Sequence, residues 1–289
     1  MKLFNSSASI LLTMALSSSA FLRINNGGWG GNRKRIIGGF SLADNGAPYL
    51  VHLTFAGPTG DYVCGGTLIA PNLVLTAAHC VINVEGVQYP VQNTTIGYGS
   101  DKISKQKFIN PTDILVHPNY TPLNDTALGT NDIAIMSLPA LHMDNTTNYI
   151  TIYNKDLQAG DEAIALGWGT TTPDHDPESM PDELKGTVVT IGDTATCKEM
   201  DPAYDSPNGD EICTLNKYHP GNSSCQADSG TGLIVRSGDV YYLAGLTSEG
   251  GSPDGNICGD AKGYVMYTNV KSHLDFIEWA TGIDGKKFM

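Results

Sequence analysis

From about residue 40 onward, hydrophobic residues occur in short runs that are separated by turn-forming residues. The runs are rich in β-branched and aromatic side chains, and Gly, Pro, Asn or Asp bounds each of them, which is the pattern of β-strands. We predict strands at Tyr49–Phe55, Asn72–Leu75, Asp132–Leu138, Ala163–Leu166, Thr187–Ile191, Gly232–Val235, Tyr241–Leu246 and Val265–Val270. No fixed-period repeat interrupts this pattern, so the fold class is all-β.

Only Lys271–Thr281 has the periodicity of a helix. Its apolar side chains lie three or four positions apart, as one face of a helix requires. These residues are Leu274, Ile277 and Ala280, with Phe276 and Trp279 widening the stripe. We therefore expect a single helix, close to the C-terminus of an all-β domain.

Residues 1–20 have the three parts of a secretory signal peptide. Lys2 gives a positive start, Ile10–Leu16 forms a short apolar run, and Ser18–Ala20 supplies small residues for cleavage. The apolar run is shorter than the roughly 20 residues that span a bilayer. A secreted protein is expected, and the even number of cysteines, 6, is compatible with disulfides outside the cell.

A second processing site follows the signal peptide. The stretch Phe21–Asn32 is rich in Gly and Asn and has little to bury, and it leads into Arg33–Arg35. Apolar Ile36 comes directly after this basic cluster, which is typical of a site where cleavage releases a new chain start. We predict a propeptide at residues 21–35 and one domain at residues 36–289.

The net charge argues against two classes of partner. It is −13 at pH 7, whereas nucleic acid and anionic membranes are bound by clustered Lys and Arg. Neither partner is therefore expected. Sequons at Asn93, Asn119, Asn124 and Asn145 suit a glycosylated surface.

Three residues have the types needed for nucleophilic catalysis. A serine hydroxyl is a weak nucleophile until a neighbouring base takes its proton, and that base must be held in the correct tautomer. His79 lies among small residues beside Cys80, Asp132 opens an apolar strand, and Ser229 lies in a tight turn near Cys225. Each alone has an ordinary structural explanation.

Together, in the order His, Asp, Ser, they resemble the trypsin/chymotrypsin family of serine proteases. The resemblance extends from Ile36 to about Trp279. It is carried by the segments Thr76–Cys80, Asp132–Met136, Ser224–Gly230, Cys64–Ile69, Val116–Pro118, Gly167–Gly169 and Tyr267–Thr268.

The resemblance implies two six-stranded antiparallel β-barrels, a C-terminal helix and an active site between the barrels. Ser229 would attack the peptide carbonyl, His79 would act as base and then as acid, and Asp132 would orient His79. Ser248 would support Asp132. The backbone N–H groups of Ala227 and Ser229 would form the oxyanion hole.

The resemblance also implies how the enzyme is switched on and cross-linked. Cleavage after Arg35 would free Ile36, whose ammonium group would pair with buried Asp228. The implied disulfides are Cys64–Cys80, Cys197–Cys213 and Cys225–Cys258. The expected partners are polypeptide substrates, an activating protease and protein inhibitors.

No cofactor or metal site is expected. Acidic residues after Cys80 are too sparse for a calcium loop, and no zinc-ligand spacing is evident. The histidines outside the triad are interpreted as structural or surface residues: His52, His117, His142, His175, His219 and His273.

The primary substrate pocket is predicted by counting from the motifs. Ser223 falls at its floor, Gly250 on one wall and Val265 on the other. A hydroxyl cannot compensate a desolvated Lys or Arg, so a preference for small or medium apolar residues is expected. In the alternative alignment Gly263 lines the pocket instead of Val265, which would leave room for aromatic residues.

The sequence departs from the family pattern in four places. Ala227 and Thr231–Gly232 replace Gly and Gly-Pro, Glu249 replaces a Trp that lines the cleft, and the loop leading to Cys258 is longer. These changes keep open the alternative of a weakly catalytic homologue that acts as a binding or inhibitory protein. A serine hydrolase acting on carbohydrate or lipid would need another motif and another order of the three residues.

Overall fold

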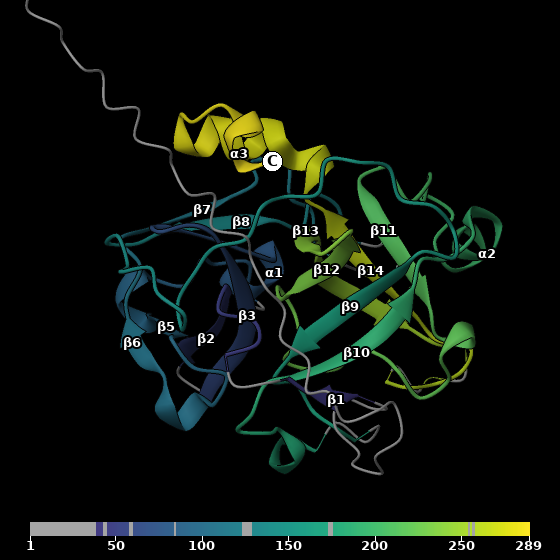
Figure 1. The fold of residues 1–289 in the computed structure, drawn as a ribbon, viewed down its shortest axis with the longest axis horizontal. Coiled ribbons are helices and arrows are strands. Elements are labelled where there is room, and N and C mark those ends of the chain that lie inside the picture. Colours follow the sequence, from purple (N-terminus) through teal and green to yellow (C-terminus); the bar gives the residue numbers. More distant parts are fainter. Residues whose placement is uncertain are drawn as a thin grey trace, which may run out of the picture.

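The structure is a computed structural model that describes residues 39–42, 45–57, 60–83, 85–122, 129–172, 176–253, 255 and 258–289. The predicted signal peptide, the propeptide and the Arg35–Ile36 junction lie outside the described residues, as do Asn124 and His175. Two antiparallel β-sheets lie side by side, and the C-terminal helix lies across one end of the pair (Figure 1).

The first sheet is formed by the N-terminal half of the described chain. Its strands follow the order β6-β5-β2-β3-β4-β8-β7. Their bounds are β2 Leu50–Gly57, β3 Gly60–Ala70, β4 Leu73–Thr76, β5 Thr94–Tyr98, β6 Lys107–Ile109, β7 Asp113–Val116 and β8 Ala134–Ser137. The two edge strands, β6 and β7, are consecutive in the chain. Only residues 110–112 separate them, so the ends of the sheet meet and the sheet curls into a barrel.

The second sheet follows the order β1-β10-β9-β12-β13-β14-β11. Its strands are β1 Phe40–Ser41, β9 Glu162–Gly167, β10 Lys185–Thr190, β11 Glu211–Leu215, β12 Gly232–Ser237, β13 Val240–Gly251 and β14 Tyr264–Asn269. An antiparallel bridge between Ile191 and Thr214 joins the end of β10 to β11. This bridge curls the second sheet into a barrel as well.

The prediction of two antiparallel barrels is confirmed, but each sheet has seven strands among the described residues rather than six. In the first sheet, Pro111 lies between β6 and β7; because proline has no N–H to donate, it interrupts what would otherwise be one strand. In the second sheet, the extra strand is β1, which adds two residues to the edge of β10.

The eight predicted strands all correspond to observed ones, with ends that differ by a few residues. Strands β1, β5, β6, β7 and β11 were not predicted from the sequence, and β3 was recognised only through the motif segment Cys64–Ile69. Several of these contain Gly, Lys, Asp or Glu, which local propensity does not favour in strands. Pairing with neighbouring strands fixes them instead.

The helices are short. They are α1 Ala78–Val81, α2 Thr194–Met200 and α3 Leu274–Thr281, with 3₁₀ turns η1 Val91–Asn93, η2 Ile103–Lys105, η3 Pro177–Ser179, η4 Asn216–Tyr218, η5 Lys271–His273 and η6 Gly285–Phe288. The expectation of one helix was wrong because α2 is a second one of similar length; the side chain of Asp193 caps it by accepting a hydrogen bond from the Thr196 N–H at 2.9 Å. None of the helices in the described ranges is long and apolar enough to cross a membrane.

The C-terminal helix packs onto the first barrel. Phe276 and Ile277 of α3 belong to the same buried cluster as Leu53 and Ile135 of that barrel. A separate cluster fills the second barrel, with Ile212 and Tyr267 fully buried. The three predicted disulfides, Cys64–Cys80, Cys197–Cys213 and Cys225–Cys258, are present.

Candidate active site

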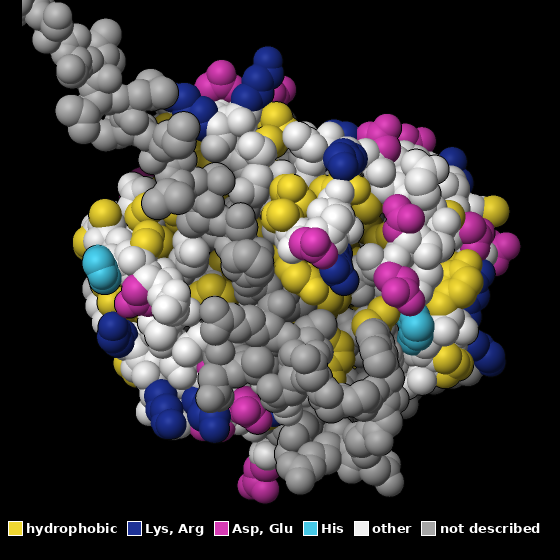
Figure 2. Space-filling model, in the orientation of Figure 1, with side chains coloured by type: hydrophobic (Ala, Val, Ile, Leu, Met, Phe, Trp, Pro, Cys, Tyr) yellow, Lys and Arg dark blue, Asp and Glu magenta, His cyan; other side chains and the backbone are white. Residues whose placement is uncertain are grey.

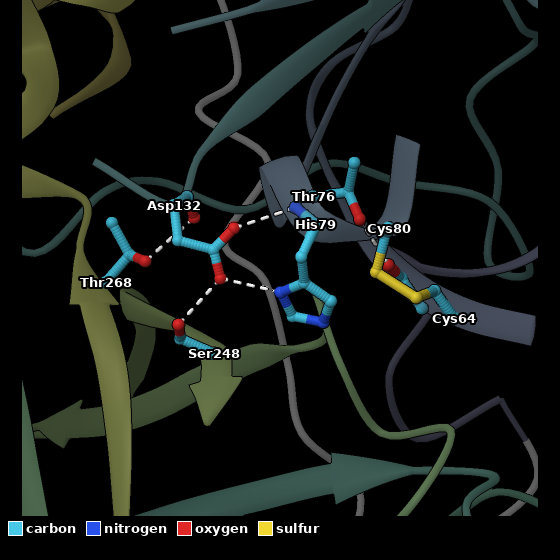
Figure 3. A network of polar contacts seen from close by, with 8 residues as sticks. Cys64, Thr76, His79, Cys80, Asp132, Ser248 and Thr268 are labelled. Atoms are coloured by element: carbon cyan, nitrogen blue, oxygen red, sulfur yellow. Dashed lines mark hydrogen bonds and ion pairs between the residues drawn. A yellow bond between two sulfur atoms is a disulfide. The ribbon is translucent and has the colours of Figure 1, made fainter. Parts of the chain in front are cut away.

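His79 lies on the one-turn helix α1, which begins shortly after strand β4 ends. Its neighbour Cys80 is bonded to Cys64 on β3, so a disulfide fixes the helix to the first barrel. The side chain of His79 remains 28% exposed. Figure 3 shows its imidazole ring turned toward the carboxylate of Asp132.

Asp132 is buried and is held from both barrels. Its Oδ1 accepts a hydrogen bond from the His79 backbone N–H at 2.9 Å, and its Oδ2 lies 2.7 Å from His79 Nδ1. The Ser248 hydroxyl of β13 donates to the same Oδ2 at 2.6 Å. The Thr268 hydroxyl of β14 donates to the backbone carbonyl of Asp132 at 2.8 Å (Figure 3). Both carboxylate oxygens therefore have hydrogen-bond partners, and the His79 ring is held with its Nδ1 toward Oδ2.

The charges of this pair shift both pKa values. Burial alone would lower the pKa of His79, but the negative charge of Asp132, its hydrogen bond and the charge of Glu249 together raise it above its ordinary value. Burial alone would raise the pKa of Asp132, but His79 and the donors around it hold that pKa below its ordinary value. Asp132 therefore stays ionised while His79 gains or loses a proton.

Ser229 lies in a turn that packs against the segment leading to His79. Its backbone carbonyl accepts a hydrogen bond from the Gly65 N–H at 2.8 Å, and the Gly65 carbonyl accepts one from the Thr76 hydroxyl at 2.8 Å. Gly230 is so close that a Cβ there would lie 2.2 Å from Thr76 Oγ1. The described residues contain no direct hydrogen bond between the Ser229 hydroxyl and His79. Half-buried Ser229 and His79 nevertheless belong to segments in direct contact.

Ala227 has a left-handed backbone, with φ of 72°. The other non-glycine residues with positive φ in the described ranges are Asn45 and Asn131, and asparagine tolerates this region better than alanine does. The structure therefore places an unfavourable backbone conformation at the departure from the family pattern. Within the described chain, the N–H groups of Ala227 and Ser229 donate to no other residue.

Asp228 points away from solvent into a site lined by glycine backbone. Its carboxylate accepts hydrogen bonds from the N–H groups of Gly169 and Cys225, each at 2.8 Å. A Cβ at Gly167 would lie 1.9 Å from Asp228 Oδ1, so no larger residue fits there. Burial outweighs these two donors and raises the pKa of Asp228 to about 7. The predicted partner, Ile36, lies outside the described residues.

The predicted pocket residues occupy neighbouring positions. Val265 pairs with Gly250 across strands β14 and β13, and Ser223 is fully buried. The carbonyl of Gly263 instead accepts a hydrogen bond from the Asn216 N–H, one residue before β14 begins. This register places Val265, rather than Gly263, opposite Gly250.

Two buried hydroxyl groups next to the predicted pocket residues had not been predicted as part of the site. The Ser224 hydroxyl lies 3.1 Å from the Tyr267 hydroxyl, and both groups are buried. Tyr267 shares a face of β14 with Val265, because side chains two positions apart point the same way. Adjacency to Ser223 and the two-residue spacing from Val265 were the available signals.

Glu249 places an additional acid beside the His79–Asp132 pair. Its Oε1 atom is buried without a hydrogen-bond partner among the described residues. Burial and the Asp132 charge raise the pKa of Glu249 to about 7, although His79 and the N–H of Gly129 act in the opposite direction. A carboxyl group therefore lies beside the His79–Asp132 pair at the position where the family pattern has an apolar tryptophan.

One group of potential metal ligands converges at this site. A ligand atom from each of Cys64, His79 and Cys80 lies within 4.8 Å of the others. Both sulfur atoms belong to the Cys64–Cys80 disulfide, so no thiolate is available to bind a metal.

On the face drawn in Figure 2, Lys and Arg side chains are scattered rather than gathered into a continuous basic patch.

Comparison with known proteins gives a consistent result. The family model described as Trypsin matches residues 36–277. The chain is 31% identical to Serine protease 1 of Drosophila melanogaster, over 86% of each chain. It is 30% identical to Trypsin of Sus scrofa, over 84% of this chain and 94% of that protein. Trypsin Blo t 3 of Blomia tropicalis is 29% identical, over 84% of this chain and 85% of that protein.

Proposed function

This chain belongs to the trypsin family of serine proteases and is a serine endopeptidase, and we propose that His79, Asp132 and Ser229 carry out its reaction. His79 Nε2 takes the proton of the Ser229 hydroxyl as the serine oxygen bonds to the peptide carbonyl carbon. His79 then donates that proton to the leaving amine. Water releases the acyl group from Ser229 by the same two proton transfers.

The hydrogen bonding of Asp132 is the observation that carries this proposal. Because Asp132 Oδ2 lies 2.7 Å from His79 Nδ1, the neutral imidazole holds its proton on Nδ1 and leaves Nε2 free to accept one. When Nε2 becomes protonated, the buried carboxylate stabilises the resulting cation. A histidine held only by packing would need neither the carboxylate nor the Ser248 donor.

The negative charge of the tetrahedral intermediate needs donors of its own. The backbone N–H groups of Ala227 and Ser229 supply them, since both are free of other acceptors among the described residues. Ala227 retains its N–H despite its side chain. The oxyanion hole is therefore retained, with one donor on an unfavourable backbone conformation.

Cleavage occurs after neutral residues of small or medium size. Ser223 at the pocket floor offers no charge to a lysine or arginine, and Val265 opposite Gly250 narrows one side. Ser248 and Glu249 directly precede Gly250 on strand β13 and complete the predicted pocket residues. Polypeptides are the substrates, and protein inhibitors that mimic them are expected partners.

The enzyme is made as an inactive, secreted precursor. Residues 1–20 direct export, and residues 21–35 are removed when an activating protease cleaves after Arg35. The new ammonium group of Ile36 then pairs with Asp228, whose buried carboxylate has only two backbone donors in the described chain. Asn93, Asn119 and Asn145 are exposed, which leaves them accessible for glycosylation.

Covalent labelling tests the nucleophile and distinguishes an enzyme from a protease-like binding protein. A fluorophosphonate probe should label Ser229 in protein cleaved after Arg35 and label the uncut precursor far more slowly. The Ser229→Ala variant is the control and should not be labelled. Labelling of another residue, or none after complete cleavage, would favour the binding or inhibitory homologue.

A further inference from the structure

The turn of residues 225–231, which carries Ser229 and is called the nucleophile turn, contains a hydroxyl that has no role in the proposed mechanism. Thr231 is fully buried, two residues after Ser229. Its hydroxyl donates a hydrogen bond to the backbone carbonyl of Asp228, and its N–H donates to the same oxygen at 3.1 Å. One carbonyl therefore receives two donors from one residue.

That carbonyl belongs to the peptide unit whose other end is the Ser229 N–H. A peptide unit is planar, with its C=O and N–H pointing in opposite directions. Holding the Asp228 oxygen therefore fixes the direction of the Ser229 N–H. Hydrogen bonds in a chain also polarise one another, so a donor on the carbonyl makes the N–H at the other end a stronger donor.

Thr231 is itself held from the second barrel. Its carbonyl accepts hydrogen bonds from the N–H and the hydroxyl of Thr247 on β13, at 2.8 and 3.1 Å. The Gly230 N–H donates to the Thr247 carbonyl at 2.7 Å. Thr247 directly precedes Ser248, which donates to Asp132, so one strand supports both the turn and the carboxylate.

A glycine of the first barrel, Gly65, leaves the space that the Thr231 side chain occupies. A Cβ on Gly65 would lie 2.0 Å from the methyl carbon of Thr231, and the Gly65 N–H donates to the Ser229 carbonyl at 2.8 Å. The peptide units before and after Ser229 are thus both held, the first by Thr231 and the second by Gly65. Ala227, on the other side of the turn, has the unfavourable φ of 72°.

We propose that the Thr231 hydroxyl is a positioning group that orients and polarises the Ser229 N–H in the oxyanion hole. The role rests on the proposed catalytic function of Ser229. The hydroxyl touches no substrate atom and acts through the Asp228–Ser229 peptide. It fixes the direction of one oxyanion donor, the Ser229 N–H. The other donor, the Ala227 N–H, belongs to a residue with an unfavourable backbone conformation.

Two pairs of variants isolate the hydroxyl. Thr231→Val replaces it with a methyl group of similar shape, and Thr231→Ser keeps it. We expect kcat to fall about tenfold in Thr231→Val with KM unchanged, because complete loss of an oxyanion donor costs about 10²–10³-fold and here the donor is only misplaced. Thr231→Ser should keep kcat within about twofold. If Thr231→Val does not fold, Thr231→Ala compared with Thr231→Ser differs by the hydroxyl alone.

Thr187→Val is the matched control. Thr187 is also fully buried, lies on β10, and its hydroxyl has no hydrogen-bond partner among the described residues. This variant should keep kcat and KM. Affinity for a peptidyl trifluoromethyl ketone, which forms an oxyanion on Ser229, should fall in Thr231→Val in parallel with kcat, while affinity for a cleaved product peptide should not change.

Three outcomes overturn the positioning role: an unchanged kcat in Thr231→Val, an equal loss in Thr231→Ser, or a loss confined to KM. Failure of the proposed function would look different. In that case the wild-type protein, after cleavage at Arg35, would neither hydrolyse peptides nor be labelled at Ser229. The wild-type measurement therefore separates the two results.

Discussion

At the scale of single residues, backbone geometry matters in this site as much as side-chain chemistry. In the proposed mechanism Ala227 supplies only an N–H, yet its φ of 72° makes the identity of its side chain relevant. Asp132 is the opposite case, since its carboxylate accepts from the backbone and ring of His79 and from Ser248. Ala227 is therefore tested by removing its methyl group, and Asp132 is tested by removing its charge.

Ala227→Gly should stabilise the protein and raise kcat. Removing the Cβ relieves a left-handed strain of about 1–2 kcal/mol, part of which the greater freedom of glycine in the unfolded chain offsets. The free energy of unfolding should rise by roughly 1 kcal/mol in a urea titration. KM should change little, because the oxyanion contact strengthens only in the transition state.

Ala203→Gly is the control for this change. Ala203 is exposed and its φ is not positive, so glycine there should lower stability or leave it unchanged. A less stable Ala227→Gly protein, or one with unchanged kcat, would mean that the turn has adapted to alanine.

Asp132→Asn should lower kcat and move the acid limb of the pH profile. The Asp132 charge raises the pKa of His79, so activity of the wild type should fall with decreasing pH through a value above 6.5, the ordinary pKa of histidine. Without that charge the pKa of His79 falls and the limb moves to lower pH. An amide that donates to Nδ1 also selects the wrong tautomer, a change that costs about 10⁴-fold in kcat in other triads.

The measurement is kcat/KM against pH, which reports the pKa of the free enzyme, for cleaved wild-type and variant protein. Asp239→Asn serves as the control, because the Asp239 side chain is 96% exposed and pairs with Arg236 on the surface. An acid limb at the same pH in Asp132→Asn would show that another group controls the protonation of the base.

At the scale of secondary-structure elements, strands β13 and β14 organise most of the site. They provide Ser248 and Thr268 to Asp132, and they place Val265 opposite Gly250. Strand β11 adds Glu211 at the other edge of β14, near Asp201 at the end of α2. We therefore expect a change at Val265 to alter specificity and a change at Glu211 to alter stability.

Val265→Gly should widen the substrate pocket. The wild type is expected to cleave after Ala, Val, Leu or Met better than after Phe or Tyr, and the variant should gain about tenfold in kcat/KM for the aromatic residues, since each methylene in such a pocket is worth about 10–200-fold. A library of peptides varied at the residue before the cleaved bond measures this preference.

Val189→Gly is the matched control for the pocket. Val189 is buried in the same cluster as Val265 but lies on β10, away from Gly250. It should lower stability without changing the preference. A wild-type preference for Phe or Tyr would refute the role of Val265, and a preference for Arg or Lys would refute the pocket assignment as a whole.

Glu211→Gln should flatten the dependence of stability on pH. Burial and the negative charges of Asp201, Glu249 and Asp132 raise the pKa of Glu211 from 4.5 to about 8. The folded state therefore binds more protons than the unfolded chain between about pH 4.5 and 8. This contribution to stability is complete below pH 4.5 and is lost as the pH rises toward 8.

Unfolding midpoints in urea at pH 5 and pH 8 test this sign. The wild type should lose more stability between the two values than Glu211→Gln does. Glu199→Gln, an exposed position on α2, should behave like the wild type. Equal slopes for the wild type and Glu211→Gln would show that Glu211 ionises normally in the folded protein.

At the scale of the whole molecule, the site depends on contacts from both barrels. The turn at Ser229 receives a hydrogen bond from Gly65 of the first barrel, and Gly230 beside it donates to Thr247 of the second. Asp228 directly precedes Ser229 in this turn, and burial raises its pKa to about 7. A new chain end that neutralised this carboxylate would therefore act on both barrels.

Arg35→Gln should yield a precursor that cannot be activated by cleavage at this site. An unpaired buried charge costs about 3–5 kcal/mol, which is enough to keep the turn around Asp228 from settling into its active form. Peptide hydrolysis should be nearly absent in the uncut variant and should appear in the wild type after cleavage. Arg236→Gln, at an exposed residue, is the control and should activate normally.

Intact mass confirms that the variant stays uncut during the assay. Equal activity in the uncut Arg35→Gln protein and in cleaved wild type would contradict zymogen control.

The sequence by itself determined the features that lie in continuous segments. Alternating short apolar runs specified the strands that predict an all-β fold, and the motifs around His79, Asp132 and Ser229 identified the candidate catalytic residues. The implied pairing of all six cysteines also agrees with the structure. The strands and motifs were readable because each depends on residues that are close in the chain, whereas the cysteine pairing followed from the family resemblance that the motifs carry.

Only the tertiary structure decided which distant groups support those residues. Thr268 reaches the carbonyl of Asp132 across 136 positions, and Thr231 meets Thr247 because β13 returns beside the nucleophile turn. Likewise, the raised pKa of Glu211 depends on burial and on charges brought near it by other elements. Sheet closure and strand register set these distances, and neither is encoded in a local pattern of hydrophobic and polar positions.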